Sequence, residues 1–254
     1  MNILLTNDDG IHGEGLWSVA RALKNRGKYF VTIAAPMKQQ SGMSHALSVL
    51  REIEYKHFDN PDFEAWTFNG TPTDCVKIYL EGMTDKKFDV VISGINDGSN
   101  LATDILYSGT VGAALEGFLH AIPSLAVSRD RESEISFDTA AEVTVDYVEK
   151  ILSIKHETVL HNLNFPKKFR ADEAEFASTR PGQRDYINAF ASRTDDDGRA
   201  YFRIGGTIYD VDAGEGTDIH AVNCGYVSVT PLHTDTADYE EIIALRKIFR
   251  SNNS

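Results

Sequence analysis

The chain opens with short apolar runs separated by amphipathic segments. An apolar run at Ile3–Leu5 is followed by Leu16–Leu23, in which the apolar residues recur at helical spacing. Gly27, typical of a helix C-terminus, precedes a second apolar run at Tyr29–Ala35. The order predicts a strand, a helix and a second strand.

The same alternation continues along the first half of the chain. Apolar runs at Phe88–Ser93 and Ser124–Val127 predict buried strands, and Thr110–His120 has the composition of a helix between them. Thr71 and Pro72 predict the start of another helix, because they suit the N-cap and the first helical position. Repeated strand–helix–strand units indicate an α/β fold with a parallel sheet and helices on both faces.

After a helix at residues 137–152 and a strand at 158–164, the pattern changes. Runs typical of strands at Tyr186–Ser192 and Tyr201–Ile204 flank Asp195–Gly198, whose Asp and Gly residues are typical of a hairpin turn. We expect an extended hairpin that forms part of an oligomer interface, with a disordered insertion as the alternative. A strand at Tyr226–Thr230 and a helix at Ala237–Phe249 close the chain.

Composition narrows the class of protein. The 254 residues, 42% hydrophobic and 25% charged, suit a soluble globular protein with one large domain. With 25 basic and 38 acidic residues the net charge is −13, which disfavours a nucleic-acid duplex as partner. Cys75 and Cys224 stand alone, and neither a signal peptide nor an apolar run of about 18 residues is seen. We expect a cytoplasmic protein without membrane association.

Two adjacent carboxylates follow the first strand. Asp8 and Asp9 lie just beyond Ile3–Leu5, at the end of the strand where open parallel sheets bind ligands. Paired carboxylates beside a buried strand are costly without a positive partner, which favours a divalent cation site. A solvated turn is the alternative, because Asp-Gly sequences often form turns.

Other predicted strands also end in small oxygen-bearing residues. Ser41, beside Gly42, follows the second strand, and Asn96 follows the strand that ends at Ser93. These loops share one edge of a parallel sheet, so carboxylate, hydroxyl and carboxamide oxygens can gather there as ligands for Mg²⁺ or Mn²⁺. Taken singly, Ser41 and Asn96 suit ordinary turns better.

The segment Ser108-Gly109-Thr110 leads into a helix rich in small residues. Free backbone N–H groups and the helix dipole at such a position favour an anion such as phosphate, although an N-cap with close helix packing explains the same residues. Walker A, dinucleotide and serine-hydrolase motifs are absent from the sequence.

The histidines carry weaker expectations. His12, His45 and His233 are isolated in sequence, as surface or capping histidines usually are. His233 and Asp104 are the candidates for the acid that protonates a leaving group.

Taken in order, these segments resemble the SurE family of metal-dependent 5′/3′-nucleotidases. The resemblance extends over nearly the whole chain and rests on these blocks: Thr6–Gly10, Ala35–Pro36 with Ser41–Ser44, Gly70–Val76, Ser93–Asn100, Tyr107–Ala114, Asn162–Pro166 and Gly225–Leu232. Ala102, Ser48 and His161 depart from the residues usual in the family, which bears on loop conformation and substrate preference.

The resemblance implies a Rossmann-like parallel sheet between helices, in a single domain over residues 1–254. Residues 1–170 would form the α/β catalytic core. Residues 171–254 would form a hairpin and helix that are exchanged between the subunits of a homodimer or homotetramer. The implied reaction is hydrolysis of nucleoside 5′- and 3′-monophosphates to nucleoside and phosphate, with polyphosphate as a second substrate and one Mg²⁺ or Mn²⁺ per subunit.

The resemblance also assigns roles to residues. The metal ligands would be Asp8, Asp9, Ser41 and Asn96. The catalytic residues would be Asp8, Asp9 and Asn96, and the substrate phosphate would lie against Ser41, Gly42, Asn96, Ser108, Gly109 and Thr110. A noncatalytic nucleotide-binding protein and a receiver-like signalling module are the alternative interpretations; a metal-dependent deacylase is a third, disfavoured because these loops lack histidine ligands.

Overall fold

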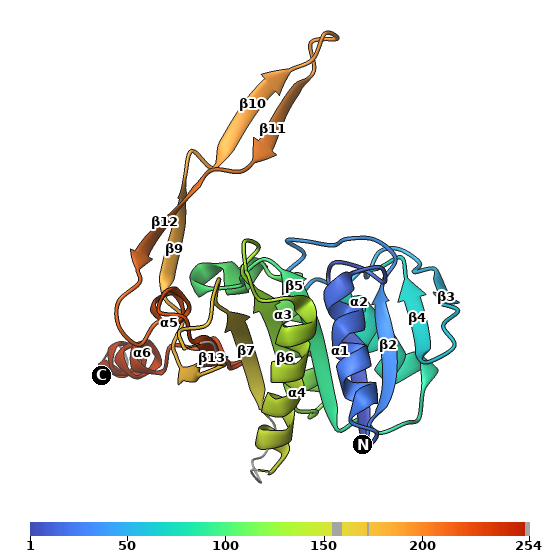
Figure 1. The fold of residues 1–254 in the computed structure, drawn as a ribbon. Helices are drawn as coiled ribbons and strands as arrows, with labels where there is room; N and C mark the ends of the chain where they lie inside the picture. Colours follow the sequence, from blue (N-terminus) through green and yellow to red (C-terminus); the bar gives the residue numbers. More distant parts are fainter. Residues whose placement is uncertain (154–158, 172, 252–254) are drawn as a thin grey trace.

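A computed structural model describes residues 1–153, 159–171 and 173–251. Its centre is a nine-stranded sheet with helices on both faces (Figure 1). The strands of this sheet are β1 (Asn2–Thr6), β2 (Phe30–Pro36), β3 (Tyr55–His57), β4 (Glu64–Phe68), β5 (Val90–Asp97), β6 (Ser124–Arg129), β7 (Leu160–Phe165), β8 (Phe176–Ser178) and β13 (Val227–Pro231).

The strand order is β3-β4-β2-β1-β5-β6-β7-β13-β8. From β4 to β7 all neighbours are parallel, which confirms the predicted α/β fold. β3 and β13 run antiparallel to β4 and β7, respectively. Because β2 lies on one side of β1 and β5 on the other, the direction of winding reverses between β1 and β5. That reversal is the switch point at which open α/β sheets bind ligands.

Four helices cover the central strands: α1 (Glu14–Asn25), α2 (Pro72–Ile78), α3 (Gly109–Leu119) and α4 (Phe137–Ser153). α1 packs against α4, and α2 packs against α3. β1 is buried on both faces, since Ile3 and Leu5 belong to the larger apolar cluster and Leu4 to the cluster containing Val76. Such a continuous apolar strand is typical of a parallel sheet covered on both sides.

The local signals in the first part of the chain are confirmed. Thr71 begins α2 with a capping box: its hydroxyl accepts from the Asp74 N–H at 3.0 Å, and the Asp74 carboxylate accepts from the Thr71 N–H at 2.8 Å. The strand predicted from residue 158 is β7, which begins at Leu160; residue 158 lies outside the described residues.

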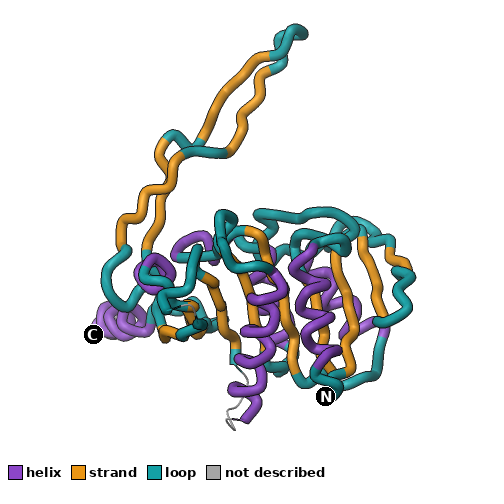
Figure 2. The backbone as a smooth tube through the Cα atoms, viewed as in Figure 1, coloured by secondary structure: helices purple, strands orange, loops and turns teal. Residues whose placement is uncertain are grey.

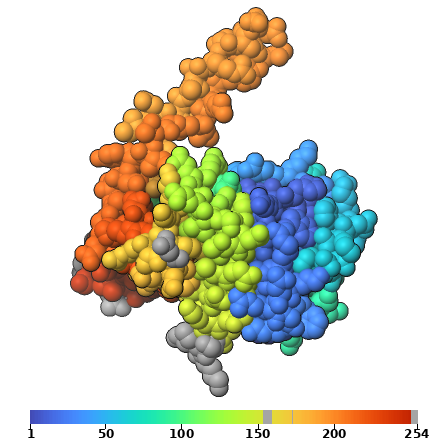
Figure 3. Space-filling model, in the orientation of Figure 1, coloured from blue at the N-terminus to red at the C-terminus, as the bar shows by residue number. Residues whose placement is uncertain are grey.

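The C-terminal part projects from the body as a two-part antiparallel arm (Figure 2). We call β9 (Gln183–Ile187) and β12 (Thr207–Asp212) the stem, and β10 (Phe190–Thr194) and β11 (Ala200–Ile204) the outer hairpin. The predicted turn is confirmed: the Asp195 N–H donates to the Arg199 carbonyl at 2.9 Å. In the space-filling view the arm extends well beyond the body (Figure 3).

The prediction of one continuous strand at Tyr186–Ser192 is wrong. The strand ends at Ile187 and resumes at Phe190, because Asn188 has a left-handed backbone with φ of 54°. The returning side of the arm bends at Gly206, which also has positive φ. A Cβ atom at Gly206 would lie 2.7 Å from the Ile187 carbonyl oxygen. Both sides of the arm therefore bend at the same position along it, and the stem and the outer hairpin form separate two-stranded sheets.

The chain ends with α5 (Asp218–Asn223), β13 and α6 (Tyr239–Ser251). The predicted closing strand and helix are confirmed. β8 and β13 lie beyond residue 170 but pair with the main sheet, and the division of the chain at that residue stays a prediction.

Candidate functional site

A polar cavity of about 260 Å³ lies at the carboxyl ends of β1 and β5, at the switch point of the sheet. Its walls come from loops after several strands and from the arm. The lining residues are Asp8, Asp9, Gln39, Ser41, Gly42, Asn96, Asp97, Gly98, Ser99, Asn100, Asp104, Tyr107, Ser108, Arg131 and Tyr186.

Asp8 and Asp9 are the adjacent carboxylates that line this cavity. Asp8 is 4% exposed, and burial raises its pKa to about 6; the hydrogen bond from Thr110 opposes the rise and the charge of Asp9 adds to it. Burial also raises the pKa of Asp9, whose carboxylate accepts from the Asp97 N–H and the Gln39 amide at 3.4 Å each. Positive charge bound beside these two groups would lower both pKa values, because it favours the ionised carboxylates.

The turn after β1 depends on close backbone packing. The Asn7 amide donates to the Gly10 carbonyl at 2.9 Å, and Gly10 itself has φ of +90°. At the other side Gly109 packs on Asp8, and a Cβ atom there would lie 3.0 Å from the Asp8 Cβ. A glycine at position 109 therefore lets α3 start directly against the carboxylate.

The loop that carries Ser41 and Gly42 is exposed but fixed at both ends. On one side the Gln40 N–H donates to the Asp8 carbonyl at 2.7 Å. On the other side Ser44 donates through its N–H to the Tyr107 carbonyl at 3.0 Å and through its hydroxyl to the Leu106 carbonyl at 2.6 Å. Ser41 and Gly42 thus reach the cavity wall from β2, as the shared-edge argument predicts.

Asn96 lies at the end of β5, and its amide donates to the Gly98 carbonyl at 2.7 Å. The loop after β5 is held by buried asparagines of β7: Asn162 and Asn164 donate to the Asn100 carbonyl at 2.8 and 3.0 Å. Asn100 in turn donates to the Ser128 hydroxyl at 2.7 Å. The Asn-Leu-Asn block of β7 therefore fixes the loop that follows Asn96.

The residues at the start of α3 lie in different places. Ser108 lines the cavity and caps α3 by accepting from the Val111 N–H at 3.1 Å. Thr110 is fully buried and donates its hydroxyl to Asp8 Oδ1 at 2.6 Å, so it orients this carboxylate from behind. Neither Thr110 nor Gly109 is among the residues that line the cavity.

Sequence reasoning missed Arg131 and Tyr186. Arg131 lies two residues beyond β6 and supplies a cationic side chain to the cavity wall. The shared-edge argument that found Asn96 applies equally to the end of β6 and would have found it. Tyr186 comes from the arm, and no local pattern in the sequence places the arm beside the cavity.

None of the three histidines is among the residues that line this cavity, whereas Asp104 is. His45 contacts Glu116 at 2.7 Å and, with His233, lines a separate apolar cavity of about 590 Å³. His12 packs edge-on against Phe58. The cavity that His233 lines shares Ser108 with the cavity at Asp8, and the role of His233 as a leaving-group acid stays a prediction.

An open α/β sheet with an oxygen-rich cavity at its switch point defines a class of proteins that bind small ligands at the carboxyl ends of parallel strands. Residues 3–188 match the family model described as Survival protein SurE. The chain belongs to the SurE family.

Similar proteins extend over almost the whole chain. A protein named 5′-nucleotidase SurE from Heliobacterium modesticaldum is 44% identical over 246 residues, covering 95% of this chain and 89% of that protein. One of the same name from a Synechococcus species is 39% identical over 252 residues, covering 97% of each. The crystal structure of the SurE protein from Aquifex aeolicus aligns with a TM-score of 0.80 and 38% identity, covering 98% of this chain and 99% of that one.

Within residues 1–153, 159–171 and 173–251, none of the helices is both long enough and apolar enough to cross a membrane.

Proposed function

We propose that this protein is a divalent-metal-dependent phosphomonoesterase that hydrolyses nucleoside 5′- and 3′-monophosphates to nucleoside and phosphate. Family membership and the names of the relatives support a nucleotidase. The observation that carries the proposal is the meeting of Asp8 and Asp9 with the N-terminus of α3 at one cavity. A noncatalytic nucleotide-binding protein is the alternative that the experiment below separates.

The residues at the cavity fit a hard cation. Burial raises the pKa values of Asp8 and Asp9, and a bound cation would offset this cost because positive charge favours the ionised carboxylates. Oxygen atoms of Ser41 and Asn96 complete a set that suits Mg²⁺ or Mn²⁺. Such an ion, when bound by these four residues, supplies charge neutralisation for a phosphoryl group and acidifies a coordinated water.

The chain's own groups hold the phosphate. Ser108 and the first N–H groups of α3 lie at the positive end of a helix dipole, which favours an anion. Arg131 adds a cationic side chain at the cavity wall. Ser99 also lines the cavity, and its buried hydroxyl has no hydrogen-bond partner among the described residues. Asn96 and Gly42 complete this phosphate-binding wall.

We also propose a homodimer or homotetramer in which the outer hairpin and α6 are exchanged between subunits. On the outer hairpin, Phe190, Phe202 and Ile204 are 66%, 77% and 80% exposed. On α6, Ile243 is 54% exposed. Apolar surface of this extent on projecting elements is typical of contacts between subunits.

The cytoplasm is the compartment we propose. Cys75 and Cys224 are free thiols, one buried and one exposed. Unpaired cysteines are typical of reducing compartments.

Phosphate release from AMP, GMP, 3′-AMP and polyphosphate, each with Mg²⁺ or Mn²⁺, tests the function. We expect turnover of the nucleoside monophosphates. Saturable nucleotide binding without phosphate release under either metal would contradict the proposal and favour the noncatalytic alternative. Phosphorylated protein that accumulates without turnover would favour the receiver-like alternative.

A further inference from the structure

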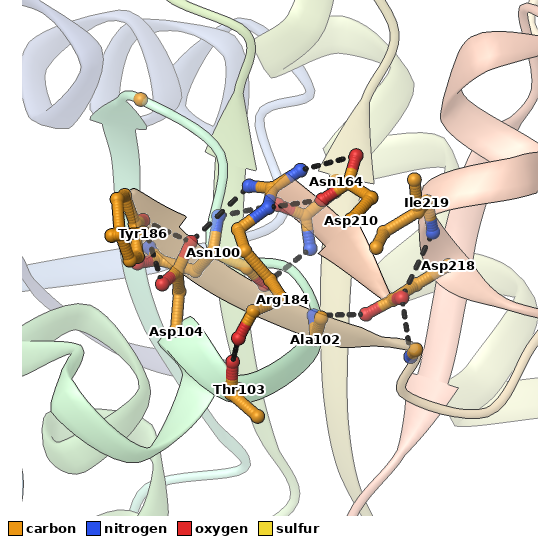
Figure 4. A network of polar contacts seen from close by, with 12 residues as sticks. Asn100, Ala102, Thr103, Asp104, Asn164, Arg184, Tyr186, Asp210, Asp218 and Ile219 are labelled. Atoms are coloured by element: carbon orange, nitrogen blue, oxygen red, sulfur yellow. Dashed lines mark hydrogen bonds and ion pairs between the residues drawn. The ribbon is translucent and has the colours of Figure 1, made fainter. Parts of the chain in front are cut away.

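The stem of the arm contributes a wall of the cavity. Tyr186 on β9 and Asp104 on the short helix η2 (Ala102–Tyr107) line the same cavity as Asp8 and Asp9. The Tyr186 hydroxyl shares its hydrogen between the two oxygens of Asp104, at 2.8 and 2.9 Å (Figure 4). The arm therefore orients a carboxylate at the cavity.

Arg184 fixes the same carboxylate from a nearly buried position, with 9% of its side chain exposed. Its guanidinium lies 3.2 Å from Asp104 Oδ2 and 2.7 Å from Asp210 Oδ1 on β12. Thr103 donates its hydroxyl to the Arg184 carbonyl at 2.5 Å. Figure 4 shows Arg184 between Asp104 and Asp210. Charge-assisted bonds of this kind are short and directional, so they hold the Asp104 carboxylate in place.

The helix that carries Asp104 is also held at its other end. The Ala102 N–H donates to Asp218 Oδ2 at 2.8 Å, and the Gly182 N–H donates to Asp218 Oδ1 at 2.9 Å. Asp218 is fully buried. The Asp218 carboxylate thus joins the start of η2 to Gly182, the residue before the stem. Because η2 is held in this way, Asp104 needs little rearrangement to meet a ligand.

The chemistry of Asp104 selects the part of a nucleotide that it contacts. An ionised carboxylate accepts hydrogen bonds at about four lone-pair positions, of which Arg184 and the shared Tyr186 hydrogen occupy only part. Phosphate oxygens are acceptors and carry negative charge, so Asp104 does not bind them. The sugar hydroxyls of a nucleotide are donors: in a 5′-monophosphate they lie on C2′ and C3′, one sugar ring away from the phosphate, and in a 3′-monophosphate the 2′-hydroxyl is adjacent to it.

We propose that Asp104 and Tyr186 form a subsite for a sugar hydroxyl of the nucleotide, in which Asp104 accepts from the hydroxyl and Tyr186 orients Asp104. The subsite rests on the proposed nucleotidase function and adds a preference for ribose over deoxyribose. It also places a residue of the arm in substrate recognition.

The test compares kcat/KM for AMP with kcat/KM for 2′-deoxy-AMP and for 3′-deoxy-AMP. A ratio cancels any uniform loss of activity. In the wild type we expect AMP to be preferred to at least one deoxy analogue by about tenfold, the value of one hydrogen bond to a charged group. Asp104→Ala should bring the ratio close to one, whereas Asp104→Asn, whose uncharged amide oxygen still accepts, and Tyr186→Phe should each lower it.

Tyr201→Phe is the matched control, because Tyr201 makes the same kind of bond, to Asp195 Oδ2 at 2.8 Å, in the outer hairpin. It should keep the wild-type ratio. Equal rates on AMP and both analogues in the wild type would overturn the subsite, as would an unchanged ratio in a folded Asp104 variant. If Asp104→Ala does not fold, the nearly isosteric Asp104→Asn decides. Failure of the wild type to hydrolyse any nucleotide would instead overturn the proposed function.

Discussion

Burial makes Asp8 a carboxyl group that resists ionisation. It is 4% exposed, its pKa is raised to about 6, and its neighbour Asp9 adds like charge. The hydroxyl of Thr110 recovers part of this cost by donating to Asp8 at 2.6 Å. A fold that keeps such a group at a ligand cavity gives up stability there, as functional sites commonly do.

This cost predicts a pH-dependent gain in stability for Asp8→Asn. The pKa of Asp8 in the folded protein lies above the ordinary 3.8. The contribution of Asp8 to the free energy of unfolding is therefore fully present below pH 3.8, where the group is protonated, and is lost as pH rises through about 6. In EDTA, Asp8→Asn should increase the free energy of unfolding by about 2–3 kcal/mol at pH 8 and by much less at pH 4. Urea unfolding at both pH values measures this.

Asp196→Asn, at the exposed hairpin turn, is the control and should change neither value appreciably. An equal gain from Asp8→Asn at pH 4 and pH 8 would show that the carboxylate of Asp8 is not the source of the cost.

At the scale of elements, α3 packs closely against the loop that carries Ser41, and a side chain on α3 at the contact would displace that loop. A Cβ atom at Gly112 would lie 2.2 Å from the Ser44 carbonyl oxygen. Gly112→Ala should therefore move the loop that carries Ser41 and reduce kcat/KM for AMP by about 10–100-fold. Steady-state kinetics with saturating Mg²⁺ measures the loss.

Gly82→Ala is the matched control, because a Cβ atom there meets its nearest neighbour, Ile78, at 4.0 Å. Its kinetics should match those of the wild type. Wild-type kinetics for Gly112→Ala would contradict the claim that the spacing between α3 and this loop positions the site.

The elements predicted from the sequence are those with strong local signals. β1 and β5 are continuous apolar runs, and α2 carries its own capping box. β4 was not predicted: it covers five residues, and its place beside β2 depends on long-range pairing. The bend at Asn188 was missed although Asn adopts the left-handed conformation more readily than most residues, because the residues on either side of it are typical of a strand.

In the site, too, some features could be predicted from the sequence and others depend on long-range contacts. Asp8, Asp9, Ser41 and Asn96 could be grouped in advance because parallel strands bring their carboxyl ends to one edge. The orientation of Thr110 toward Asp8 depends on the rotational phase of α3, which the sequence does not define.

At the scale of the whole molecule, the arm can be shortened without disturbing the stem. Removing residues 189–205 joins Asn188 to Gly206 between the paired residues Ile187 and Thr207. Both joined residues have positive φ, and Asn-Gly is the preferred two-residue hairpin turn. The deletion should keep Tyr186 in place and retain kcat/KM, while the loss of exposed apolar residues of the outer hairpin reduces the assembly.

Light scattering after gel filtration measures the mass of the assembly, and the full-length chain at the same concentration is the control. An unchanged mass would show that the outer hairpin makes no contact between subunits.

The central claim is that Asp8 and Asp9 hold a divalent cation on which nucleotide hydrolysis depends. The most direct measurement is phosphate release from AMP and GMP before EDTA, after EDTA, and after Mg²⁺ or Mn²⁺ is restored. We predict that activity is lost with EDTA and recovers with the metal, and that Asp9→Asn lowers kcat/KM by about 10²-fold or more at any metal concentration. Full turnover in EDTA, or full activity of Asp9→Asn, would contradict the account.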